Sequence, residues 1–158
     1  MRKISVIVGV ADDSEVPASV INEIHMGFRG VRDVQLEFVV VRRVPGSAVD
    51  LTMTTGDFVA IFDATEGYDP KDVRRVLTPL LDGKADVVVG RESGVAVSLR
   101  ERAANFFLGW VAGWLFRTDF GGGVTGLRAF CRSALGLPVR ALRVVEVPVS
   151  HQESAVPP

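Results

Sequence analysis

The sequence predicts an α/β fold, a three-layer sandwich built around a mainly parallel β-sheet. Short β-branched runs alternate with segments whose apolar residues recur at helical spacing, which is typical of strands joined by crossover helices. The 158 residues are 47% hydrophobic, which suits one domain with a single sizeable core. The only cysteine, Cys131, excludes a disulfide scaffold.

The predicted strands are apolar runs that each end at a glycine or a polar residue. The first of them is followed by Asp12 and Asp13, as expected for a buried parallel strand that reaches the surface at its carboxyl end. By this criterion we expect strands at residues 4–10, 34–41, 58–62, 85–89 and 144–149.

The predicted helices carry apolar residues three and four positions apart between recognisable start and stop signals. One covers residues 16–28 and stops at Gly30, and a second opens at Pro70 and closes at Gly83. A long helical region is expected over 98–117, and a further helix over 126–135. Residues 1–150 then form one domain, and 151–158 form a frayed tail.

Charge is unevenly distributed along a chain whose formal net charge is −1, because residues 98–143 hold seven basic and two acidic side chains. The near-neutral total lacks the basic excess of a dedicated nucleic-acid binder, so we expect no nucleic-acid partner. The longest apolar stretch, 103–116, is shorter than the roughly 20 residues that span a bilayer. The run after the first three residues is too short for an export signal. We therefore expect a cytoplasmic protein and leave peripheral contact with a membrane open.

The segment 56–70 holds the clearest candidate chemistry. Its hydrophobic strand delivers Asp63 to the carboxyl end, where ligands bind in parallel sheets. Carboxylate oxygens suit Mg²⁺ or Mn²⁺, and such a cation neutralises a diphosphate. Asp63 and Glu66 are therefore candidate metal ligands. The alternative is that these loop acids are solvated and that Asp69 caps the following helix.

Six short segments follow one another in the order of a known set of motifs: 5–13, 37–41, 56–64, 85–91, 125–130 and 145–149. Gly-Asp-x-x-x-x-x-Asp-Ala at 56–64, Ala-Asp-Val-Val-Val-Gly-Arg at 85–91 and Thr-Gly-Leu-Arg-Ala-Phe at 125–130 carry most of the likeness. They resemble the family 2 glycosyltransferases of GT-A fold, in particular the dolichyl- and polyprenyl-phosphate sugar transferases.

This resemblance implies a reduced GT-A-like domain that transfers a sugar from a nucleoside diphosphate sugar to a lipid phosphate or similar acceptor. Asp63 would then hold the metal and the diphosphate, and Asp119 would orient the acceptor. Of the other matching positions, Asp12 and Asp13 would lie near the nucleoside, and Arg91 and Arg128 near phosphates. The alternatives are that Arg128 forms a structural ion pair and that Asp119 caps a turn.

The sequence also departs from that family. Arg42 and Arg43 replace the two acids that end the second strand, and Thr65 replaces a carboxylate of the Asp-Ala-Asp motif. The connection from 43 to 57 is short, which implies the loss of a strand–helix unit. The two arginines either pair with a diphosphate or lipid phosphate, or form a solvated strand end with an ion pair to Asp12 or Asp63. A catalytically inactive binding protein is therefore the alternative function.

The long helical region carries an aromatic face that includes Phe107, Trp110 and Trp114, and arginines flank it. Aromatic rings bounded by cations suit a helix lying in a membrane interface. The alternative is an ordinary core or dimer helix, which leaves a homo-oligomer open.

Overall fold

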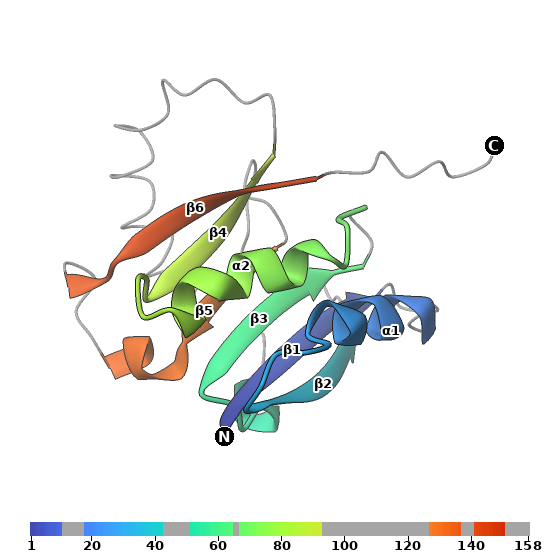
Figure 1. Ribbon diagram of the computed structural model, residues 1–158, viewed down its shortest axis with the longest axis horizontal. Coiled ribbons are helices and arrows are strands. Elements are labelled where there is room, and N and C mark those ends of the chain that lie inside the picture. Colours follow the sequence, from blue (N-terminus) through green and yellow to red (C-terminus); the bar gives the residue numbers. More distant parts are fainter. Residues whose placement is uncertain (11–17, 43–50, 65–66, 93–126, 137–140, 151–158) are drawn as a thin grey trace.

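The structure is a computed structural model that describes residues 1–10, 18–42, 51–64, 67–92, 127–136 and 141–150. Within these residues six strands form one sheet in the order β2-β1-β3-β5-β4-β6 (Figure 1). All strands run parallel except β5, which is antiparallel to both neighbours, so the predicted mainly parallel sheet is confirmed. The strands are β1 Arg2–Val10, β2 Val34–Arg42, β3 Phe58–Asp63, β4 Val87–Glu92, β5 Arg128–Cys131 and β6 Val144–Val149.

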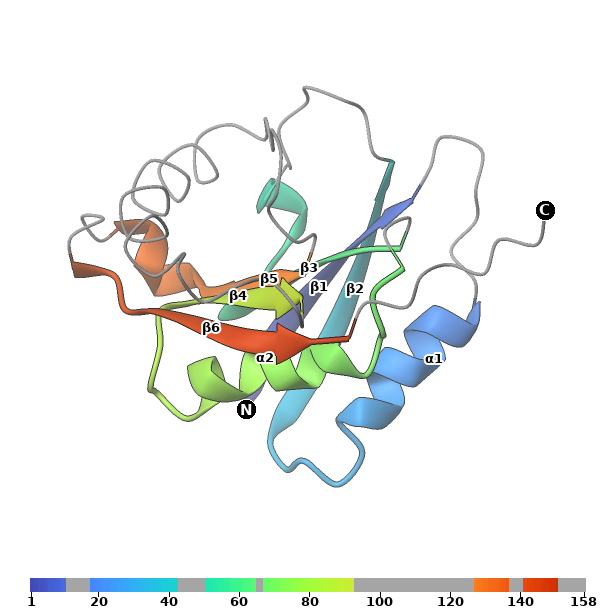
Figure 2. The ribbon, with the colours of Figure 1, turned by 90° about the horizontal axis from the view of Figure 1, so that it is seen from above.

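Two α-helices, α1 (Ala18–Gly27) and α2 (Asp72–Leu81), lie on the same side of the sheet (Figure 2). They confirm the first two predicted helices, and Gly30 and Gly83 adopt the positive φ angles that favour glycine after a helix. Short 3-10 helices occupy Leu51–Met53 (η1) and Arg132–Gly136 (η3). Within the described residues, no helix is long and apolar enough to cross a membrane. The helical region expected over 98–117 lies outside them.

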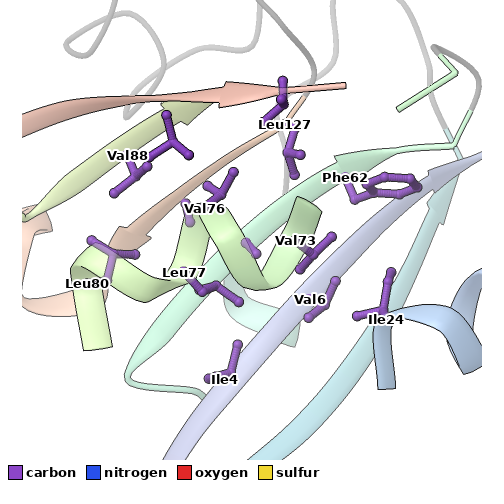
Figure 3. Close-up of a cluster of buried hydrophobic side chains, with 14 of the residues drawn as sticks. Ile4, Val6, Ile24, Phe62, Val73, Val76, Leu77, Leu80, Val88 and Leu127 are labelled. Atoms are coloured by element: carbon purple, nitrogen blue, oxygen red, sulfur yellow. The ribbon is translucent and has the colours of Figure 1, made fainter. Parts of the chain in front are cut away.

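The main core is packed between the sheet and these two helices (Figure 3). Ile4, Val6 and Phe62 of the strands meet Ile24 of α1 and Val73 of α2. Alternate residues of the same strands point to the opposite face, because side chains alternate along a strand. There Ile7, Val59, Ile61, Val87, Val89 and Phe130 form a second buried cluster, which we call the rear cluster.

The helix expected over 126–135 is wrong. Residues 128–131 form β5 between β3 and β4, and 132–136 form η3. The segment 127–131 is too short for its pattern of apolar and basic residues to distinguish a strand from a helix. Its conformation is decided by the two neighbouring strands, whose backbone groups would otherwise be unpaired.

Candidate functional site

Five strands run in the same direction, so their carboxyl ends lie together along one edge of the sheet, perpendicular to the strands: β1, β2, β3, β4 and β6. Strand β5 starts at this edge, since it is antiparallel to β3 and β4. The expected site residues at strand ends therefore belong to one edge of the sheet. Which face of the sheet each one occupies then decides which of them can act together.

Asp63 is the last residue of β3 and is partly exposed. It lies opposite Gly9 of β1, and the backbone N–H of Ala64 donates to the Gly9 carbonyl at 2.9 Å. A Cβ placed on Gly9 would lie 3.9 Å from the Asp63 carboxyl carbon, so a larger side chain there would rest against the carboxylate. Gly9 thus leaves room beside the Asp63 side chain, while pairing of β3 with β1 and the Ala64 hydrogen bond fix the backbone around Asp63.

Asp63 and Arg128 lie on the same face of the sheet. Asp63 is two residues beyond Ile61, and Arg128 is directly opposite Ile61 of β3 and Val89 of β4. Because Ile61 and Val89 belong to the rear cluster, both site residues are on the face opposite α1 and α2. Diagonal neighbours of this kind have side chains within about 7–8 Å of each other.

Arg128 is only 4% exposed, which is unusual for a guanidinium group. Its position at the start of β5 depends on a close approach of three strands. The Gly90 N–H donates to the Leu127 carbonyl at 2.9 Å, and a Cβ on Gly90 would lie 2.9 Å from that oxygen and 3.0 Å from Val149. The glycine of the predicted Gly90-Arg91 motif is therefore required by packing next to Arg128.

Arg42 is on the other face. It is paired with Val10, whereas Val41 is paired with Gly9, so the alternation along β2 turns Arg42 to the α1 and α2 side. Its side chain is exposed. The structure therefore separates Arg42 from Asp63 and Arg128, and the ion pair considered between Arg42 and Asp63 is not formed in the described structure.

Several predicted site residues fall outside the described part of the chain: Asp12, Asp13, Arg43, Glu66, Asp119 and the aromatic residues Phe107, Trp110 and Trp114. Arg91 lies in β4 opposite Pro148, next to the start of β5. Among the described residues no group of three metal-ligating side chains occurs. Mg²⁺ is commonly held by one or two carboxylates and by substrate phosphates, so Asp63 fits the role of a protein ligand that a substrate completes.

The opposite end of β3 is fixed by a polar network that the sequence did not reveal. The buried Ser5 hydroxyl donates to Glu37 at 2.5 Å and accepts from the Gly56 N–H at 2.8 Å. Glu37 also accepts from the Thr55 N–H at 3.0 Å and pairs with Lys3 at 3.8 Å. The Ser5 hydrogen bond is the main cause, followed by the Thr55 N–H, of a lowered Glu37 pKa.

A second network ties β5 to the same end of β3. The Arg132 guanidinium donates to the Gly56 carbonyl and to the Thr54 hydroxyl, both at 2.6 Å. The Arg132 N–H also donates to the Asp57 carbonyl at 2.8 Å. These contacts join residues more than 70 positions apart, so no local sequence signal could have identified them.

Buried Asp72 anchors the end of β6 at the candidate site edge. Its carboxylate accepts from the Ser150 N–H at 2.7 Å and lies 3.4 Å from Arg75. An acid in the first turn of the helix that follows Pro70 is a recognisable sequence signal for a helix start. Its tertiary partner, Ser150, could not be read from that signal.

No protein-family model matches the chain, and no curated protein matches its sequence. Solved structures do match its fold. Glucosyl-3-phosphoglycerate synthase from Mycobacterium tuberculosis, in complex with Mn²⁺, UDP and phosphoglyceric acid, is 19% identical and has a TM-score of 0.55. The match covers 95% of this chain and 69% of that one.

Two further structures agree. The same Mycobacterium tuberculosis enzyme with Mg²⁺ and UDP is 21% identical over 95% of this chain and 70% of that one, with a TM-score of 0.56. Mannosyl-3-phosphoglycerate synthase from Rubrobacter xylanophilus is 15% identical over 98% and 68%, with a TM-score of 0.60. At this identity the matches establish the fold, and the expected GT-A-like α/β architecture is confirmed.

Proposed function

We propose that this chain transfers a glycosyl group from a nucleoside diphosphate sugar to an acceptor that carries a phosphate group. One observation supports this most strongly. Asp63 ends a central strand at the ligand-binding edge of a fold shared, over 95% of the chain, with enzymes solved with UDP and Mn²⁺. The buried Arg128 on the same face adds a positive charge near a site for an anionic ligand.

In this proposal Asp63 and Glu66 are the protein ligands of a Mg²⁺ or Mn²⁺ ion. The metal, when bound, would neutralise the diphosphate leaving group. Arg91 and Arg128 would supply positive charge to the phosphates, and Asp12 and Asp13 would contact the nucleoside. Arg42 has no part in this constellation because it lies on the other face.

The remaining task of the protein is to position donor and acceptor, and Asp119 is assigned to the acceptor. A polyprenyl phosphate is already ionised near neutral pH, so it would attack through a phosphate oxygen without a strong general base. A phosphoglycerate would instead attack through its hydroxyl group, whose proton must pass to a base. Orientation and charge stabilisation can then supply most of the rate enhancement. The acceptor is either a small phosphate ester of the phosphoglycerate type or a polyprenyl phosphate.

A turnover assay tests this proposal. Release of nucleoside diphosphate from UDP- and GDP-sugars is measured with Mn²⁺, using phosphoglycerate in one arm and polyprenyl phosphate in vesicles in the other. We expect turnover in one arm and a loss of at least about 100-fold in Asp63→Asn. Asp57→Asn, at the other end of β3, is the matched control and should retain activity. Turnover that is equal in both variants would remove Asp63 from the site.

A membrane-bound acceptor makes a further demand on the protein. The aromatic residues Phe107, Trp110 and Trp114 would then bind the membrane interface that carries the lipid phosphate. Flotation with anionic vesicles should carry the chain upward and should fail after replacement of Trp110 and Trp114 by alanine. Flotation that the replacements leave unchanged would reject this part of the proposal.

The alternative function is that of a non-catalytic protein that retains the fold and binds a partner or a membrane. Thr65, in place of a carboxylate, favours it, because a metal site loses affinity when it loses charge. The same assay separates the two functions. An absence of turnover and of nucleotide-sugar binding across the whole panel would support the non-catalytic function.

A further inference from the structure

Strand β2 forms an outer edge of the sheet along its full nine-residue length. It pairs with β1 on one side, from Val34 opposite Arg2 to Arg42 opposite Val10. In the part of the chain that the structure describes, the β2 backbone makes no hydrogen bond on its other side. Because backbone groups alternate in direction along a strand, about half of its N–H and C=O groups point outward. Such a row is a template for another strand.

The other outer strand, β6, is protected against such pairing. It has six residues, and two of them are Glu146 and Pro148. Proline removes a backbone donor and confines a strand to an edge, and a charged side chain discourages addition of a further strand. Strand β2 has no proline, and its internal charged residue, Glu37, is already bound within the chain by Ser5, Thr55 and Lys3. The four residues after it, 38–41, are all apolar. The two edges of one sheet are therefore different surfaces.

The side chains of β2 are also incompletely covered. Leu36 and Phe38 pack only partly against the main core, and Val40 on the same face is 49% exposed. Val39 and Val41 pack partly against the rear cluster on the other face. A strand added alongside would cover apolar side chains on both faces as well as the backbone groups.

We propose that β2 pairs antiparallel with β2 of a second copy of this chain, about a two-fold axis at Phe38. This register places Phe38 beside its own copy and Leu36 opposite Val40, so the half-exposed apolar residues of one face meet each other. The two-fold axis closes the assembly at a dimer, which uses up both free edges.

The charges at the ends of the strand favour a second copy in this orientation. Asp33 precedes β2 and Arg42 ends it, and both are exposed. Neither forms an ion pair in the described part of the chain. In the antiparallel register, Arg42 of one copy lies opposite Val34 of the other. Asp33 precedes Val34, so Asp33 of each copy lies beside Arg42 of the other copy, and two pairs of opposite charges form. A parallel pairing would place like charges together.

Sedimentation velocity of the 158-residue chain between about 1 and 100 µM tests this proposal. We expect a reversible monomer–dimer equilibrium. Val40→Lys places two lysines near the dimer axis and should weaken the dimer at least about tenfold. The matched control is Val144→Lys on β6, where a valine of 37% exposure lies on the other edge strand. Circular dichroism should show that both variants remain folded.

A charge exchange tests the register. Asp33→Arg and Arg42→Asp should each weaken the dimer, and the double variant should restore it. Hydrogen exchange should show protection of residues 34–42 in the native dimer that is lost in Val40→Lys. The proposal is overturned by a monomer at every concentration or by species that grow beyond a dimer. It is likewise overturned by a dimer that Val144→Lys abolishes but Val40→Lys does not, or by a double variant no better than the weaker single variant.

Discussion

The two ends of β3 each carry an aspartate of one sequence motif, but they are built for different purposes. At the amino end, the backbone of Asp57 is held on both sides, because its N–H donates to the Lys3 carbonyl and its carbonyl accepts from the Arg132 N–H, both at 2.8 Å, while the residue itself is exposed. At the carboxyl end, Asp63 faces a glycine and is partly exposed. The amino end of β3 is fixed by tertiary hydrogen bonds at Gly56 and Asp57, whereas the carboxyl end presents a carboxylate beside a glycine.

Gly56→Ala should break the anchored end most severely. A Cβ at this position would lie 2.6 Å from the Ser5 backbone nitrogen and 2.9 Å from the Lys3 carbonyl, and backbone atoms cannot move aside cheaply. We expect a loss of about 3 kcal/mol in the free energy of unfolding, measured by urea denaturation. Gly27→Ala is the control, because its Cβ would meet only Arg74 at 3.7 Å. Equal losses in the two variants would contradict the close packing at Gly56.

Arg132→Met should have the next largest effect. It removes two hydrogen bonds from a charged donor, to the Gly56 carbonyl and the Thr54 hydroxyl, while keeping an apolar stem. We expect a loss of about 2 kcal/mol in unfolding free energy, with nucleotide-sugar binding retained below the transition. Loss of binding with unchanged unfolding free energy would contradict the assignment of stability to the amino end of β3 and of binding to its carboxyl end.

The smallest expected effect concerns acid stability. The hydrogen bonds from Ser5 and Thr55 lower the pKa of Glu37 below its ordinary value of 4.5. A carboxyl whose pKa is lower in the folded than in the unfolded state stabilises the fold above pH 4.5, and this contribution is lost as the pH falls through the lowered pKa. Glu37→Gln should therefore flatten the acid limb of a plot of unfolding free energy against pH. Part of the slope should remain, because Arg143 also lowers the pKa of Asp86.

The sequence predicted the elements whose patterns are local. The apolar run of β1, the helical period of α2 and the aspartate that ends β3 each identified their elements, and the GT-A-like fold followed from the order of short motifs. Alternation along β2 could also have shown that Arg42 shares a face with Phe38 and Val40, but its separation from Asp63 depends on how β2, β1 and β3 pair.

What the sequence could not predict depends on partners far along the chain. Residues 128–131 form a strand because β3 and β4 flank them, not because of their own pattern. Ser5, Glu37 and Thr55 are ordinary residues in the sequence, and only folding brings them together at Gly56. The burial of Arg128 likewise follows from the strands on both sides of it.

The most direct test of the central claim compares the two aspartates of β3 in one titration. Calorimetry with UDP-glucose and Mn²⁺ is carried out on Asp63→Asn and Asp57→Asn, together with urea denaturation of both. We predict that Asp63→Asn loses metal-dependent binding and keeps its unfolding free energy, whereas Asp57→Asn keeps binding. Metal-dependent binding that survives in Asp63→Asn as well as in Asp57→Asn would contradict the assignment of the site to the carboxyl end of β3.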